Sequence, residues 1–170
     1  QFGDQGWIDG IKVTDTHEKN GVIYHETEAP IAVGTEVKGE LDYKERFSRM
    51  QQHTGEHMLS GIIHRLYGYD NVGFHLGAAE TTMDFNGELT SEQVREVETL
   101  ANQAVWDNIP VEILYPTKEE LASMDYRSKI EIEGQVRIVT VPGYDVCACC
   151  APHVKKTGEI GMLKLVNMVN

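Results

Sequence analysis

Long hydrophobic runs, cysteines and basic residues are all scarce in this sequence. No apolar run approaches the roughly 20 residues of a membrane-spanning helix, so we expect no membrane partner. Lysine and arginine number 15 against 27 aspartate and glutamate residues, a formal net charge of -12. This charge argues against broad, non-specific binding of nucleic acids. One RNA end can still dock at a local basic patch, although a solvated surface is the simpler interpretation of the candidates: Lys155, Lys156, Lys164, Arg46 and Arg49.

Cysteines are few, odd in number and confined to residues 147–150, which makes a disulfide framework a poor interpretation. Cys147, Cys149 and Cys150 suit a reducing compartment and a thiolate metal ligand instead, and we expect a cytoplasmic protein. The rest of the composition, with 41% hydrophobic and 25% charged residues, is ordinary for a globular protein. Because the sequence begins at Gln1 without an initiator methionine, we expect it to be part of a longer protein.

The first 45 residues combine short strand-like runs with strong turn signals. Asp9-Gly10 separates Trp7-Ile8 from a run at 11–13, and Asn20-Gly21 precedes a run at 22–24. Asn-Gly and Asp-Gly are typical of two-residue hairpin turns. Residues 36–41 alternate between polar and apolar as a half-buried strand does. We therefore predict a β-rich N-terminal subdomain over residues 1–45, built as a small barrel or a sheet.

Residues 46–170 mix helical and strand patterns. Apolar spacing predicts a helix from Arg46 to Tyr67, with Gly68 as its C-terminal cap. Thr90-Ser91 predicts the start of a second helix, which Pro110 ends. Strands are expected over 72–85, 111–115, 136–141 and 161–169, with a short helix over 118–124 and a cysteine-rich loop before the last strand. The predicted class is α+β, with an α+β sandwich over residues 46–170.

Two residue pairs with the same spacing indicate a metal site. His53 and His57 lie four residues apart, and therefore one turn apart on one face of the predicted helix. Cys149 and His153 repeat the spacing on the predicted loop. Three imidazoles and one thiolate form a tetrahedral zinc set, and the two pairs together favour a metal over chance. Two cysteines remain open as substitutes for Cys149: Cys147 and Cys150.

The same helix also fits the H-x-x-E-H signature of zinc peptidases, as His53-Thr54-Gly55-Glu56-His57. In such enzymes the two histidines hold zinc and the glutamate activates a water. Glu131 or Glu133 is then a candidate third ligand. This alternative leaves Cys149 and His153 without a role, and we rank it second.

Three blocks of the sequence resemble the editing domain of alanyl-tRNA synthetases and their freestanding AlaX relatives. The blocks are Gln1-Phe2-Gly3-Asp4-Gln5-Gly6-Trp7-Ile8, similar to the tail of a glycine-rich Q-x-x-D-x-G segment; residues 53–59, similar to the H-x-x-x-H-L/I helix; and residues 149–161, similar to C-x-x-x-H followed by T-G-E-I-G. Pro152 stands where synthetases usually carry threonine, which points toward AlaX-like proteins. We find no ATP-site segment, so this chain by itself is not expected to charge tRNA.

The resemblance implies a fold and a substrate. The fold is a small N-terminal β-barrel subdomain followed by the α+β editing core shared with threonyl-tRNA synthetases. The substrate is the acceptor end of alanine tRNA mischarged with serine or glycine. A pocket built for alanine rejects glycine and serine poorly, so a second, hydrolytic site is useful. A non-catalytic zinc module that binds RNA remains a third alternative.

The remaining site residues follow from the expected hydrolysis of an aminoacyl ester. Zinc can activate water, polarise the carbonyl or orient the substrate amine, and a full set of protein ligands favours orientation or a structural role. Glu56 and Thr54, between the two histidines, are candidate catalytic residues, although Glu56 is equally a solvated helix glutamate. Candidate substrate-binding residues are His75, Thr81 and Thr82 in the strand region, and Gln1, Asp4 and Gly6 in the N-terminal block.

Overall fold

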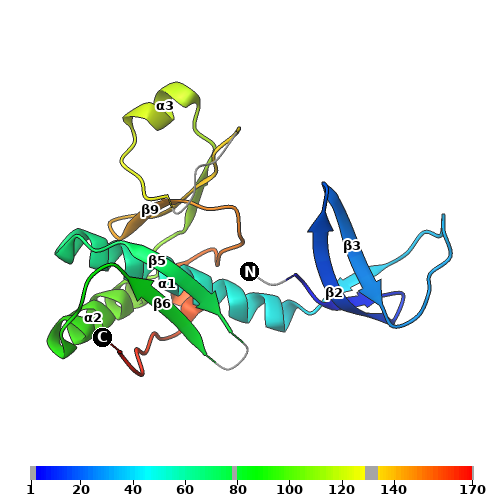
Figure 1. Cartoon of the computed structure of the whole chain (residues 1–170), viewed down its shortest axis with the longest axis horizontal. Helices are drawn as coiled ribbons and strands as arrows, with labels where there is room; N and C mark the ends of the chain where they lie inside the picture. The colour runs from blue at the N-terminus through cyan, green and yellow to red at the C-terminus, as the bar shows by residue number, and fades with distance from the viewer. Residues whose placement is uncertain (1–2, 78–79, 129–133, 170) are drawn as a thin grey trace. The chain divides into compact units, whose positions relative to one another are not determined.

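A computed structural model describes residues 3–77, 80–128 and 134–169. The chain divides into two compact units, residues 1–49 and 50–170 (Figure 1). In the first unit an antiparallel sheet has the strand order β3-β2-β1-β4. Its strands are β1 (Gly6–Ile8), β2 (Ile11–Lys19), β3 (Val22–Thr27) and β4 (Gly39–Leu41).

Both predicted hairpins of the first unit are confirmed. Asp9 and Gly10 between β1 and β2 have φ values of 48° and 78°, and Asn20 and Gly21 between β2 and β3 have 55° and 75°. Two successive residues with positive φ match the twist of a two-residue hairpin. β4 is shorter than the run predicted over 36–41. No pairing joins β3 to β4 among the described residues, so the predicted barrel closure is not confirmed.

The second unit is a mixture of helices and antiparallel strands, as the α+β prediction requires. Its hairpin and its three-stranded sheet have the strand orders β5-β6 and β7-β8-β9. The elements are α1 (Tyr43–Tyr67, beginning before the boundary), β5 (Asn71–Leu76), β6 (Thr81–Phe85), α2 (Ser91–Asp107), β7 (Glu112–Leu114), α3 (Lys118–Ser123), β8 (Ile138–Val141), β9 (Asp145–Ala148) and the 3₁₀ turn η1 (Thr157–Ile160).

Helix α1 is buried along its middle, where polar residues are as deeply enclosed as apolar ones. Every residue from His53 to Ile63 is buried. The helix begins at Tyr43 rather than Arg46, and Gly68, at φ 71°, donates its amide to the His64 carbonyl and ends it as predicted. Because buried polar groups require hydrogen-bond partners or ions, a candidate functional site is expected where the polar residues of this stretch face their neighbours.

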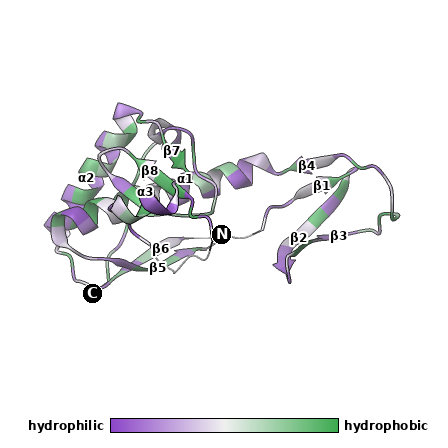
Figure 2. Cartoon of the chain, turned by 90° about the horizontal axis from the view of Figure 1, so that it is seen from above, coloured by the Kyte–Doolittle hydropathy of each residue, from purple (hydrophilic) through white to green (hydrophobic). Residues whose placement is uncertain are grey.

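Helix α2 follows the predicted amphipathic pattern, which Figure 2 shows as bands of opposite hydropathy. Thr90 and Gln93 form a reciprocal capping box at its start. It ends before Pro110, because Asn108 adopts a left-handed C-cap. The core of the unit joins α1, α2 and the three-stranded sheet through buried apolar residues that include Met58, Leu59, Ile62, Val97, Ala101, Val105, Ile138, Val139 and Val141.

Two sequence predictions for the C-terminal part are wrong. Residues 161–169 form no strand, and two of them bond to side chains of α2 instead: Asn102 pairs with both the N–H and the carbonyl of Leu163, and Glu98 accepts from the Leu165 amide. The cysteine-rich segment is also not wholly a loop. Cys147 lies within β9, opposite Val139 of β8, and only the two later cysteines follow the strand.

Candidate metal centre

Helix α1 and the segment after β9 bring together the four residues that share the four-residue spacing. One ligand atom from each of His53, His57, Cys149 and His153 lies within 4.8 Å of all the others. The three histidines are buried and Cys149 is half-buried. The Cys149 Sγ is 3.6 Å from His53 Nε2, and the His53 and His153 rings stack at 4.3 Å. Such a compact set of three imidazoles and one thiol has the composition of a tetrahedral metal site.

The protonation states of the cluster favour a thiolate at Cys149. Burial alone raises the pKa of Cys149, but the adjacent imidazoles of His153, His53 and His57 outweigh burial and lower the pKa to about 3. Burial also lowers the pKa of His153, to about 4, against the opposing effect of Cys149. A thiolate and a neutral imidazole are the forms in which cysteine and histidine bind metals.

Cys147 differs from Cys149 in the same surroundings. Burial, reinforced by the charge of Asp145, raises the pKa of Cys147 to about 12, so its thiol keeps its proton. Cys147 does lie near His57 and Asp145 in an overlapping group of possible ligands. The thiolate character of Cys149 and its contact with His53 make Cys149 the better ligand. Cys150 is exposed and belongs to neither group.

Two buried nitrogen atoms of the cluster support the fit of a metal ion. His53 Nδ1 and His153 Nε2 have no hydrogen-bond partner among the described residues. Leaving buried polar atoms unsatisfied is costly, and an ion is one explanation for such atoms. The other ring nitrogen of His153 lies 3.1 Å from the Thr54 hydroxyl, so Nε2 is the atom available to a ligand. The residues present therefore fit a soft divalent cation.

Thr54 is completely buried and joins α1 to the segment after β9 that carries Cys149 and His153, called the ligand loop below. Its hydroxyl donates to the Met50 carbonyl at 2.9 Å and accepts from the Val154 amide at 3.2 Å. Together with the contact to His153, these bonds engage the hydroxyl on three sides. The geometry thus connects Thr54 to the orientation of His153.

Glu56 is buried, with 2% of its surface exposed, so the alternative of a solvated helix glutamate is wrong. Its Oε1 accepts from Ser60 Oγ at 2.7 Å and from Asn71 Nδ2 at 3.0 Å. Asn71 also donates to Ser60, and the Gly73 amide donates to Asn71. This network ties α1 to the start of β5 through one carboxylate.

One arginine and one threonine hold the ligand loop, and neither was predicted as a site residue. Arg137 Nη1 donates to the carbonyls of Cys149 and Ala151 at 2.6 and 3.0 Å. Thr157, in the T-G-E-I-G block, donates to the Ala104 carbonyl and accepts from the Ile109 amide. The block therefore anchors the end of the loop to α2. The block's sequence pattern was the available signal for Thr157, whereas nothing in the sequence marked Arg137.

The substrate-binding candidates lie in both units. His75 on β5 is exposed and pairs with Asp84 at 3.5 Å, while Thr81 is half-buried and Thr82 exposed on β6. In the first unit Asp4 pairs with Arg46, and Gly6 is buried in β1, where an added Cβ would lie 2.0 Å from the Glu40 carbonyl oxygen. Gln1 lies outside the described residues, as do the peptidase candidates Glu131 and Glu133.

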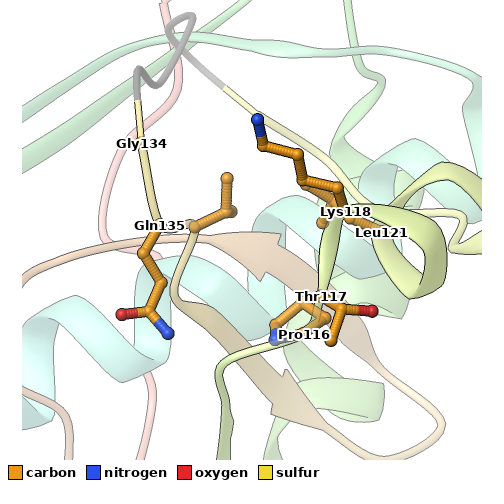
Figure 3. Close-up of a pocket in the computed structure, with 7 residues that line it drawn as sticks. Pro116, Thr117, Lys118, Leu121, Gly134 and Gln135 are labelled. Carbon is orange, nitrogen blue, oxygen red and sulfur yellow. The ribbon is translucent and has the colours of Figure 1, made fainter.

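A separate surface pocket of about 300 Å³ lies beside α3 (Figure 3). Its lining belongs to the segment around the α3 N-terminus and to the segment before β8, and it includes none of the four clustered residues: Pro116, Thr117, Lys118, Leu121, Gly134, Gln135 and Val136. Over the described residues, no helix is both long and apolar enough to span a membrane.

Comparisons with known proteins match the sequence over nearly its whole length. A family profile described as "Threonyl and Alanyl tRNA synthetase second additional domain" matches residues 136–168. The alanyl-tRNA editing protein AlaX-L of Pyrococcus horikoshii is 35% identical over 98% of this chain and 43% of its own length. Aarsd1-B of Xenopus laevis, also named an alanyl-tRNA editing protein, is 30% identical over 98% and 41%. An alanine--tRNA ligase of Metallosphaera sedula is 33% identical over 99% of this chain and 20% of the ligase. The chain thus spans less than half the length of these relatives.

Proposed function

Because this chain is a relative of the alanyl-tRNA editing proteins along nearly its entire length, we propose that it is an aminoacyl-tRNA editing hydrolase. The reaction is hydrolysis of the ester that joins serine or glycine to alanine tRNA. The observation that carries the proposal is the buried cluster of three histidines and one cysteine, which lies in two of the three blocks that resemble the family. No segment of the chain is assigned to ATP-dependent charging.

We further propose that the cluster holds one zinc ion through His53, His57, Cys149 and His153. A set of four thiolate and imidazole ligands suits zinc better than calcium or magnesium, which prefer oxygen ligands. When bound, zinc would hold the aminoacyl group in place or polarise its carbonyl. With four protein ligands the ion keeps no open position, unlike catalytic zinc sites, so orientation or a structural role is favoured over activation of water.

The buried neighbours of the cluster position its ligands, and we assign neither of them direct proton transfer. Thr54 holds His153 through its ring Nδ1, so Thr54 acts on the ligand. Glu56 accepts hydrogen bonds from Ser60 and Asn71 and is enclosed by protein. A general base must reach its proton within hydrogen-bond distance, and one oxygen of the carboxylate, Oε1, is engaged in the α1–β5 connection.

Recognition of the substrate requires groups outside the cluster. We propose that the β5–β6 hairpin, with His75, Thr81 and Thr82, supplies hydrogen bonds to a serine hydroxyl. The N-terminal block contributes Gln1, Asp4 and Gly6 in the same proposal. We propose a barrel-like subdomain over residues 1–45 and an editing core over residues 46–170, a division four residues before the boundary between the two compact units. The partner is the acceptor end of tRNA in the cytoplasm, and the relatives' greater length favours further domains.

The test combines metal analysis with deacylation. Purified protein should contain about one zinc per chain and release serine or glycine from alanine tRNA, while leaving correctly charged alanyl-tRNA intact. His57→Ala should abolish both properties. His64→Ala is the matched control, because His64 lies on the same helix but is half-exposed and outside the cluster. Cleavage of a peptide library without deacylation would establish the peptidase alternative, and zinc or RNA binding without either activity would leave a non-catalytic module.

A further inference from the structure

A buried carboxylate lies next to the candidate metal centre of the second unit and has no role in the proposed function. Asp145 begins β9, and its side chain is 2% exposed. Its Oδ2 lies 2.9 Å from Nδ1 of His57, whose side chain is also 2% exposed. No sequence motif indicated this residue. We infer that Asp145, clamped by Arg127, is a positioning residue that fixes the His57 ring with Nε2 directed at the metal.

A buried carboxylate is costly unless it is paired and hydrogen-bonded. Arg127 provides this pairing through two nitrogens of its guanidinium: Nε donates to Oδ1 at 2.8 Å and Nη2 donates to Oδ2 at 3.0 Å. This two-point geometry fixes the plane of the carboxylate as well as its position. Both oxygens of Asp145 are therefore engaged, and the carboxylate cannot rotate away from His57 without breaking the pair.

The backbone of Arg127 is itself attached to β9. Its amide donates to the Val146 carbonyl, and its carbonyl accepts from the Ala148 amide, each at 2.9 Å. The guanidinium therefore starts from a fixed point beside the strand that carries Asp145. Asp145 also approaches α1 closely, because a Cβ at Gly61 would lie 2.8 Å from the Asp145 Cβ. Strand and helix are packed so that the carboxylate reaches the ring directly.

The direction of the hydrogen bond determines which nitrogen faces the other ligands. An ionised carboxylate only accepts hydrogen bonds, so Nδ1 of His57 carries the hydrogen. In the neutral, metal-binding form of the ring the free lone pair is then on Nε2, the nitrogen left over for the group that His57 forms with Cys149 and His153. Carboxylate–histidine–metal arrangements of this kind fix the ring tautomer and orientation and strengthen the ligand. The inference rests on the proposed metal role of the cluster, but not on the identity of the substrate.

The test measures metal affinity in Asp145→Asn, Arg127→Lys and a control. Asparagine removes the charge and places an amide against the guanidinium, whereas lysine keeps a cation but loses the two-point clamp. Asp70→Asn is the control, since Asp70 pairs with His64 of the same helix at 2.9 Å in an exposed site. Zinc affinity is measured by competition with a chromophoric chelator. We expect about 10- to 100-fold weaker binding for Asp145→Asn, a smaller loss for Arg127→Lys, and no change for the control.

Two further readouts separate positioning from a merely structural role. The visible spectrum of the cobalt-loaded protein should change in Asp145→Asn, and the rise in melting temperature caused by zinc should shrink. A variant with a lower melting temperature without metal, but with the parent's zinc-induced rise, affinity and cobalt spectrum, would overturn the inference. If Asp145→Asn does not fold, the same measurements on Arg127→Lys decide, and parent-like values there overturn it.

None of these metal-binding measurements depends on deacylation. A parent protein that binds zinc and cobalt but releases no amino acid would refute the proposed function and leave the role of Asp145 intact. A parent that deacylates but takes up neither metal would do the reverse.

Discussion

Two buried glycines on α1 allow a matched test of how closely the helix that carries His53 and His57 is packed. An added Cβ at Gly61 would lie 2.2 Å from the Tyr144 carbonyl oxygen and 2.8 Å from the Asp145 Cβ. An added Cβ at Gly55 would lie 2.7 Å from Leu163 Cδ2, the far end of a flexible side chain. The two substitutions to alanine are chemically identical, so their difference reports the packing partner.

The two substitutions are expected to change the free energy of unfolding by different amounts. In a helix interior, alanine is more favourable than glycine by about 1 kcal/mol. At Gly61 the backbone turn before β9 must retreat by roughly 1 Å, and overpacking of this kind costs typically about 1–3 kcal/mol. Since the obstacle is backbone, we expect the upper part of that range and a net destabilisation of about 2 kcal/mol. At Gly55 a rotamer change in Leu163 costs about 0.5–1.5 kcal/mol, so the net change is close to zero.

The assay is urea unfolding of both variants and the parent, at fixed zinc and again with a chelator. Gly61→Ala should lower the transition midpoint, and it should also weaken zinc binding, because the displaced turn carries Asp145. Gly55→Ala should do neither. If Gly61→Ala proved as stable as Gly55→Ala, with parental zinc affinity, the close approach of α1 to the turn before β9 would be refuted.

Three further predictions concern single buried contacts. Cys149→Ala should lower zinc affinity and single-turnover deacylation by more than about 100-fold, a larger loss than is typical when a residue that only hydrogen-bonds to a metal ligand is replaced. Its far-ultraviolet circular dichroism should stay native, and a normal metal content would remove Cys149 from the ligand set. Glu56→Gln should retain zinc and lose less than about tenfold in deacylation, because its amide oxygen can still accept from Ser60 and Asn71; a loss of about 10²–10⁴-fold at matched zinc would indicate a general base. Thr157→Val should destabilise the protein by about 1–3 kcal/mol in denaturant titrations, since it leaves a part-buried amide at Ile109 unpaired; an unchanged midpoint would contradict this anchoring role.

Local rules predicted the parts of this protein that depend on neighbours in sequence. Asn20-Gly21 forms a hairpin turn through its own backbone preference, and Thr90 caps the following helix by accepting from the Gln93 amide, three residues on. The four-residue spacing of His53 and His57 similarly gave a shared helix face, and repetition of the spacing at residues 149 and 153 indicated the grouping that the structure contains.

Contacts between distant residues had no such signal. Arg127 and Asp145 are 18 positions apart, and Arg137 acts on carbonyl groups, which every residue possesses. The predicted final strand over 161–169 is wrong for a related reason: the backbone of Leu163 and Leu165 bonds to Asn102 and Glu98 of α2 rather than to another strand. Tertiary partners override local strand preference in this way.

The separation of the two ligand pairs along the chain has a consequence for biosynthesis. Cys149 follows His53 by 96 positions, so an ion held by both would cross-link a loop that includes α2 and most of the strands. For a covalent link around a loop of this size, chain-entropy estimates reach about 4–5 kcal/mol. During translation, α1 emerges before Cys149 and His153 and at that stage can offer only its two histidines, a weak chelate. Tight retention of an ion by all four residues would have to wait until the segment through His153 has left the ribosome.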